Sequence, residues 1–195
     1  MQKALTATDG DMDKAAEYLR EQGVNIAAKK ASRIASEGLV GAYMSADGKV
    51  GALAEINCES DFVANSDPFI ALVGSVTKQV AETDPSSLEA LLAAPATFDE
   101  GTVQDAINNA TAKIGEKISL RRFVRMEVDG RAETYIHMSG KIGVLLGVSR
   151  RRRRRQRRVQ GRLPRHRYAY RGFCAQVHLR MRGSRRGSRT RARNS

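Results

Sequence analysis

The chain has 195 residues, of which 41% are hydrophobic, and this length accommodates one or two small domains. It has no apolar run long enough to span a membrane and no secretory signal, so we expect a cytoplasmic protein without a membrane segment. The two cysteines, Cys58 and Cys174, lie far apart without metal-ligand spacing, which argues against a disulfide framework and against a zinc site.

Charge is divided unevenly along the chain. The net charge of the whole sequence is +13, a value typical of nucleic-acid-binding proteins. Residues 149–195, however, hold 19 Arg and no Lys, Asp or Glu, and six of these arginines are consecutive at 150–155. Residues 1–148 hold 15 basic and 21 acidic residues, a net charge of −6. A folded domain does not usually change its composition so abruptly, so we expect residues 149–195 to be separate from the domain before them.

The first 36 residues have helical patterns. Residues 1–23 predict two short helices around the turn Thr8-Asp9-Gly10, with Asp11 as the N-cap of the second and Gly23 as its end. The second helix has one apolar face, made of Met12, Ala15, Ala16 and Leu19. Residues 25–36 are rich in Ala and Lys and also favour a helix.

Strands and helices then occur in separate runs. The Asp-Gly pair at 47–48 predicts a hairpin between strands at 39–44 and 50–58. Helices are predicted from the Asp67-Pro68 start, at 86–93 and at 103–114, and strands at 118–128, 134–138 and 141–148, with a tight turn at Asp129-Gly130. The apolar stripe of the first of these helices is Phe69, Leu72, Val73, Val76 and Val80. This order favours an α+β fold built from antiparallel strands and helices.

Few residues suggest catalysis. No glycine pattern matches a phosphate-binding or dinucleotide-binding loop, so we expect no catalytic residue and no cofactor or metal site. A thiol enzyme that uses Cys58 with His137 is conceivable, but a small buried cysteine on a sheet face is the favoured interpretation. His137 is more typical of a hydrogen-bonded structural or interface histidine.

The stretch N-C-E-S-D-F-V-A-N at 57–65 has two interpretations. A strand ends in polar residues, and Phe62-Val63 follows before the next helix begins. In the first interpretation, Phe62 and Val63 pack into the local core and Asp61 caps a turn. In the second, Asp61 and Phe62 form a rigid wedge on a loop that inserts into a partner.

The same stretch closely resembles the N-C-Q-T-D-F-V-A signature of the bacterial elongation factor Ts family. Further segments in the family's order are similar to its helical N-terminal domain (2–23), its linker (26–40) and two parts of its core (112–123 and 135–148). The resemblance implies a guanine-nucleotide exchange factor, not an enzyme. The implied partner is the GDP form of elongation factor Tu, from which GDP and Mg²⁺ are released during translation elongation.

The resemblance also implies which residues bind that partner. Asp61 and Phe62 match the pair that inserts beside the magnesium and phosphate site of the GTPase, and Ser60 and Val63 complete the element. Ser60 stands where the family usually has Thr. His137 matches a family histidine in the second half of the core that lies toward the partner.

Five segments follow from this alignment by motif. They are an incomplete ubiquitin-associated-like helical domain (1–23), a linker helix (24–37), the first half of the core (38–128), the start of its second half (129–148) and a non-family tail (149–195). The first helix of the small domain is missing, which a misplaced start codon at Met1 would explain. The tail is expected to be disordered. Without the rest of the core, we expect an impaired exchange factor with an unpaired apolar strand edge.

The tail itself is interpreted as a frameshift product that begins after about Val148. Read one base later, codons permitted for residues 166–186 spell I-G-M-H-I-A-A-S-A-P-K-Y and onward, which is similar to the family's next helix. An alternative is a basic-tailed RNA- or ribosome-associated protein on an elongation-factor-like core. The tail has few aromatic residues and no RNA-binding signature, but its arginines would bind RNA non-specifically through counterion release.

Resequencing the coding DNA across the codons for Gly147 to Arg155 tests the frameshift. A missing or extra base near codon 149 would place the error in the recorded sequence, whereas a confirmed frame would place the lesion in the gene. In either case we expect the shifted frame to encode the peptide given above. A shifted frame that encodes stop codons or an unrelated peptide would contradict the interpretation.

Overall fold

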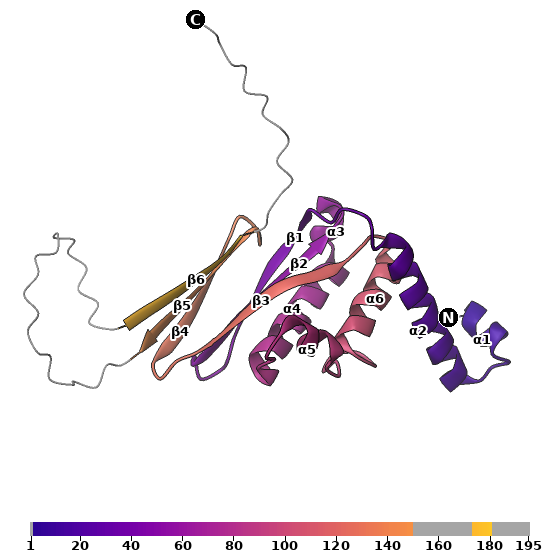
Figure 1. Cartoon of the computed structure of the whole chain (residues 1–195), viewed down its shortest axis with the longest axis horizontal. Helices are drawn as coiled ribbons and strands as arrows, with labels where there is room; N and C mark the ends of the chain where they lie inside the picture. The colour runs from indigo at the N-terminus through magenta and orange to yellow at the C-terminus, as the bar shows by residue number, and fades with distance from the viewer. Residues whose placement is uncertain (1, 150–172, 181–195) are drawn as a thin grey trace, which may run out of the picture.

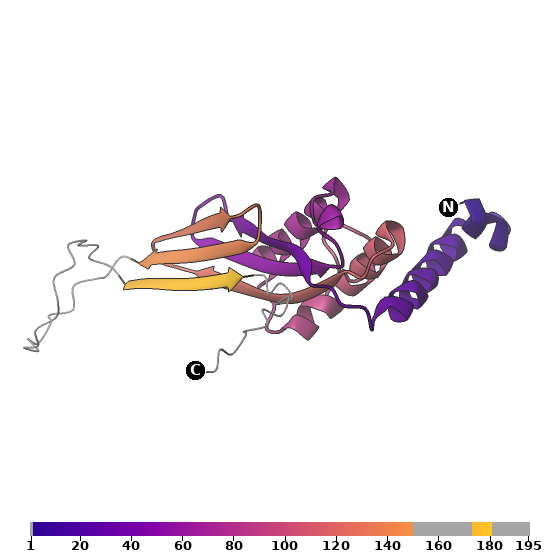
Figure 2. The same cartoon turned by 90° about the horizontal axis from the view of Figure 1, so that it is seen from above.

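The computed structural model describes residues 2–149 and the backbone of residues 173–180, and confirms the α+β class. Its elements form three layers (Figures 1 and 2): the sheet β4-β5-β6, the sheet β1-β2-β3 and a layer of helices. The two N-terminal helices lie at the far end of the helical layer (Figure 1). No helix in the described part of the chain has the length and apolar character needed to cross a bilayer.

The N-terminal helices differ from expectation at one glycine. Helix α1 (Gln2–Ala7) and helix α2 (Met12–Lys30) flank the predicted turn, and the Asp11 side chain caps α2 by accepting bonds from two backbone N–H groups. The prediction that this helix ends at Gly23 is wrong, because α2 continues to Lys30. Gly23 is buried against helix α6, where an added Cβ would lie 2.9 Å from the side-chain oxygen of Asn109. A close helix contact therefore explains this glycine.

The predicted apolar face of α2 is mostly exposed. Only Ala15 is buried, whereas Met12 and Leu19 are 59% and 40% exposed. Apart from Ala15, the face is therefore not covered by other described residues.

The first sheet has the order β1-β2-β3 and is antiparallel. Strands β1 (Glu37–Met44) and β2 (Val50–Cys58) form the predicted hairpin, and Gly48 takes a positive φ of 67° in its turn. Strand β3 (Ser119–Glu127) pairs with the other edge of β2. The central strand β2 is buried along almost its whole length.

Helices cover one face of this sheet. They are α3 (Asp61–Ala64), α4 (Asp67–Thr83), α5 (Leu88–Ala93) and α6 (Val103–Ile114). All five residues of the predicted apolar stripe of α4 are buried, in one core cluster with Ala52, Ala54 and Ile56 of β2. The Asp67-Pro68 start predicts Asp67 as the N-cap of α4, whereas Ser66 occupies that position. Helix α6 begins with a capping box between Thr102 and Asp105.

The second sheet packs on the opposite face of the first. Strands β4 (Arg131–His137) and β5 (Ile142–Ser149) form a hairpin, whereas the Asp129-Gly130 turn carries the chain from one sheet to the other. The glycines of β5 permit this close packing. A Cβ at Gly143 would lie 2.5 Å from Val40, and one at Gly147 would lie 2.5 Å from Met126.

One segment of the arginine-rich tail is a strand, which corrects two expectations. Strand β6 (Phe173–Arg180) pairs antiparallel with β5, from Ile142↔Arg180 to Ser149↔Phe173. Residues 173–180 are therefore not disordered, and the outer edge of β5 is not unpaired. From Ala175 to Arg180 the sequence alternates apolar and polar residues, a pattern typical of strands. The rest of the tail lies outside the described residues.

Two glycines test the packing of α4 on β1. We expect Gly41→Ala to lower the free energy of unfolding by about 1–3 kcal/mol, because its Cβ would lie 2.6 Å from Val73 Cγ1 and against the Thr77 hydroxyl. Gly74→Ala is the matched control, since no atom lies within 4 Å of its added Cβ on the exposed side of α4. It should raise stability by roughly 0.5–1 kcal/mol. Urea denaturation followed by circular dichroism measures both, and equal effects would contradict this packing.

Candidate functional site

The candidate site is the single helical turn α3, which follows the end of β2. Because β2 is held between two layers, its last residue, Cys58, is fully buried and fixed. Two residues later, Ser60 has an extended conformation and caps α3. The Ser60 hydroxyl accepts a bond from the N–H of Val63 at 3.3 Å, which satisfies one of the free donors at the start of the turn.

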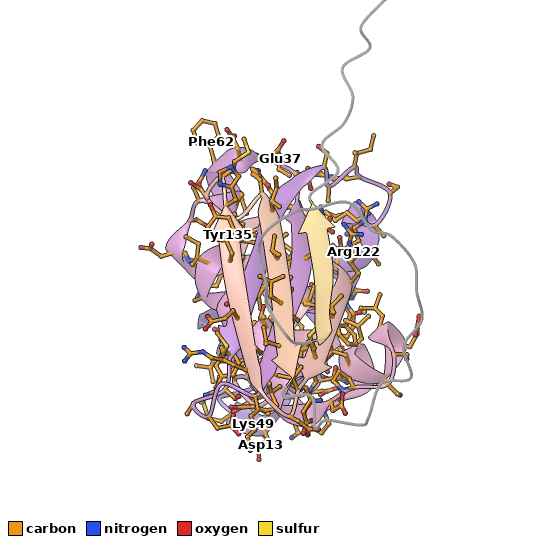
Figure 3. All side chains as sticks on the ribbon, turned by 90° about the vertical axis from the view of Figure 1, so that its left-hand side faces the viewer. Asp13, Glu37, Lys49, Phe62, Arg122 and Tyr135 are labelled. Atoms are coloured by element: carbon orange, nitrogen blue, oxygen red, sulfur yellow. The ribbon has the colours of Figure 1, made fainter. Side chains whose placement is uncertain are left out.

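The turn is amphipathic and presents one aromatic ring to solvent. Ala64 is buried and Val63 packs against the main core, so one side of the turn is anchored. Asp61 is exposed, and Phe62 is 86% exposed, the largest fraction among the exposed large hydrophobic side chains of the described residues. In Figure 3 the Phe62 ring projects from one end of the molecule, beside Glu37 and opposite Lys49. This exposure excludes the interpretation in which Phe62 packs into the local core.

A second turn, which contains Glu116 and Lys117, is hydrogen-bonded to the residues that precede α3. The Glu116 carboxylate accepts two bonds from Ser60, one from its backbone N–H at 2.9 Å and one from its hydroxyl at 2.6 Å. The next residue, Lys117, donates its backbone N–H to the Glu59 carboxylate at 2.6 Å. This bond, and to a lesser extent the nearby Arg33 guanidinium, lowers the pKa of Glu59. Residues 59–60 and 116–117 therefore form one polar network.

His137 lies at the end of β4. Its ring is exposed and stacks on Tyr135, with centroids 5.9 Å apart, and its Nδ1 lies 3.1 Å from the Tyr135 hydroxyl. Figure 3 places Tyr135 toward the same end of the molecule as Phe62. The Met138–Lys141 turn that follows is held there by Lys141, whose ammonium pairs with Glu37 at 2.6 Å.

Comparisons with known proteins decide the family. A family profile described as "Elongation factor TS" matches residues 59–160, which is more than half of the chain and includes α3 and His137. The chain belongs to the elongation factor Ts family. Proteins of this family act in translation elongation, which is part of protein biosynthesis.

Curated relatives agree with this assignment. "Elongation factor Ts" of Clostridium novyi (strain NT) is 47% identical over 146 residues, covering 74% of this chain and 48% of the relative. That of Clostridium perfringens (strain SM101 / Type A) is 49% identical over 144 residues, covering 73% and 47%, respectively. That of Azoarcus sp. (strain BH72) is 48% identical over 146 residues, covering 75% and 48%, respectively. The chain thus spans about half the length of the relatives it matches.

The sequence predicted residues 60–63 and His137 as site residues, but it did not predict the polar network of residues 59–60 and 116–117. Glu116 and Lys117 lie more than 50 residues from Ser60 along the chain, and no local pattern connects them. The available signal was Gly115, which ends α6 in the left-handed region at φ 87° and reverses the chain toward β2. Among the described residues, no group of three His, Cys, Asp or Glu side chains is arranged to hold a metal ion.

The geometry argues against a thiol nucleophile. The Cys58 thiol is buried and donates to the Ser60 carbonyl at 3.1 Å, whereas His137 is exposed and interacts with Tyr135. Burial, with a smaller effect of the Glu116 carboxylate, raises the pKa of Cys58 to about 12. A thiol with this pKa is almost entirely protonated near neutral pH, so it is a poor nucleophile.

We therefore expect Cys58 to resist iodoacetamide in the native chain at pH 8 and to react fully in urea. Peptide mass spectrometry measures this site by site, so that Cys174 does not interfere. Rapid native alkylation of Cys58, complete within minutes, would contradict the burial and the raised pKa.

Proposed function

We propose that this chain is a guanine-nucleotide exchange factor for elongation factor Tu, and that it promotes the release of GDP and Mg²⁺ from that GTPase. The observation that carries the proposal is the exposed Phe62 beside Asp61 on an anchored turn, in a chain of the elongation factor Ts family. An exposed phenyl ring on a flexible loop would bind weakly, because the loop would lose conformational entropy on binding. Anchored by Val63 and Ala64, it is preorganised for insertion into a pocket.

The four residues of the turn have different roles in this mechanism. Phe62 supplies the apolar anchor that enters the partner, and Asp61 brings a carboxylate close to the partner's Mg²⁺ and phosphate site. Ser60 and Val63 hold the turn. Nucleotide affinity in such GTPases depends on Mg²⁺ and on backbone N–H groups around the phosphates. Displacing these groups weakens several charge-assisted bonds at once.

The proposed activity is a coupling between two ligands and needs no covalent step. If binding of this chain weakens GDP on the GTPase, GDP must weaken binding of this chain by the same factor. A second contact is proposed at His137. Its ring and that of Tyr135 stack on the exposed end of β4, and together they offer an aromatic surface with a polar edge.

Removal of the Phe62 ring tests the proposal. We expect Phe62→Ala to slow GDP release from elongation factor Tu by about 30-fold, since a central aromatic anchor contributes about 2 kcal/mol or more to an interface. Folding should be unchanged, because Phe62 is 86% exposed. Stopped-flow release of a fluorescent GDP analogue, at a series of concentrations of this chain, measures the rate.

Met12→Ala is the matched control, since Met12 is also an exposed large apolar residue, at 59%. It neighbours Asp13, which lies at the end of the molecule opposite Phe62 in Figure 3. We expect it to leave GDP release unchanged. Equal release rates for the Phe62→Ala variant and the unaltered chain would refute the wedge role, and no stimulation by the unaltered chain would refute the exchange function.

A further inference from the structure

We propose that Glu116 is a positioning residue that fixes the direction in which α3 presents Asp61 and Phe62. It acts through Ser60 and does not itself contact the partner. The inference rests on the proposed exchange function for its biological meaning. Its structural content, the restraint of residue 62, does not depend on that function.

The contact is a two-point restraint on one residue. Glu116 Oε2 accepts from the Ser60 backbone N–H at 2.9 Å, and Glu116 Oε1 accepts from the Ser60 hydroxyl at 2.6 Å. The same hydroxyl oxygen accepts from the Val63 N–H at 3.3 Å. A chain of bonds therefore leads from the Glu116 carboxylate through Ser60 into the backbone of α3. Two bonds to one planar carboxylate fix both the main chain and the side chain of Ser60.

Helix α3 needs such a restraint because it is too short to be stable alone. It has four residues, and a single turn gains too few bonds to offset the entropy of ordering its backbone. Its apolar anchors, Val63 and Ala64, hold its C-terminal half. Glu116 holds the residue that precedes its N-terminal half, where Asp61 and Phe62 lie. The exposed pair is thus fixed from both sides.

Glu116 is itself held by the turn to which it belongs. Lys117 donates its backbone N–H to Glu59 at 2.6 Å and its ammonium to the carbonyls of Ala31 and Arg33 at 2.6 and 2.9 Å. The Lys30 ammonium also bonds the Gly115 carbonyl, at 2.5 Å. The 115–117 turn therefore joins two segments that are far from it in the sequence: the end of α2, and the link between the end of β2 and the start of α3.

The carboxylate at position 116 accepts from both the N–H and the hydroxyl of Ser60. A glutamine could keep both contacts, because the Ser60 hydroxyl can also accept a bond from an amide N–H, so Glu116→Ala is the variant that removes the restraint. Loss of the restraint should let residue 62 sample more directions before binding, while the bound turn is fixed by its partner in any case. We expect the half-saturating concentration for GDP release to rise about tenfold in Glu116→Ala, with less than about a twofold change in the maximal rate.

The chain contains no tryptophan, so Phe62→Trp introduces a single tryptophan at the exposed position, which can be excited selectively over the five tyrosines. In this background we compare Glu116→Ala and Ser60→Ala with a control, Glu82→Ala. Glu82 is an exposed carboxylate of α4 that pairs with Lys78, away from α3 along the helix. Time-resolved fluorescence anisotropy reports the nanosecond motion of residue 62, and urea denaturation reports the stability of the core.

We expect a larger fast component of the anisotropy decay in Glu116→Ala and in Ser60→Ala, and no change in Glu82→Ala. The double variant should show little more motion than either single variant, because both remove the same restraint. Unchanged anisotropy in Glu116→Ala would overturn the inference, even if exchange were slower. Increased motion in a chain that does not stimulate GDP release would support the positioning role and reject only the exchange function.

Discussion

The burial of β2 on both faces is the constraint on which the rest of the structure depends. One face of this strand, with Ala52 and Ala54, packs against α4, and the other, with Leu53, packs against Leu145 of the second sheet. A central strand buried on both faces requires a layer on each side. The order of layers in Figure 1 follows from this requirement. The small residues Ala52 and Ala54 on one face of β2 set how closely α4 can approach the strand.

The second sheet can approach the first sheet closely only where side-chain volume and charge allow it. Gly143 and Gly147 remove the side chains that would clash, while the fully buried Glu55 is paired with Arg122 at 2.5 Å and with Arg121 at 3.9 Å. An unpaired carboxylate at this position would cost several kcal/mol. The two arginines of β3 therefore stabilise a charge that the sandwich of sheets would otherwise exclude.

The candidate site is rigid because it directly follows the buried strand β2. Strand β2 belongs to the middle layer, between the second sheet and the helices. Where β2 ends, the chain leaves this layer, and α3 forms immediately beside the 115–117 turn. A rigid strand end, an N-cap at Ser60 and the Glu116 carboxylate together hold an exposed phenyl ring in one direction. Exposure of Phe62 has an energetic cost in water, which is offset by the buried anchors Val63 and Ala64 on the same turn.

The sequence by itself determined the features that follow local rules: the hairpin at Asp47-Gly48, the stripe of α4, the span of α6 and, by resemblance at 57–65, the family. Only the tertiary structure decided which faces meet. It extended α2 through Gly23, divided β3 and β4 between two sheets, paired β5 with residues 173–180, exposed Phe62 and placed Glu116 on Ser60. Local patterns record the period of an element and its caps, whereas these outcomes depend on contacts between residues far apart in the chain.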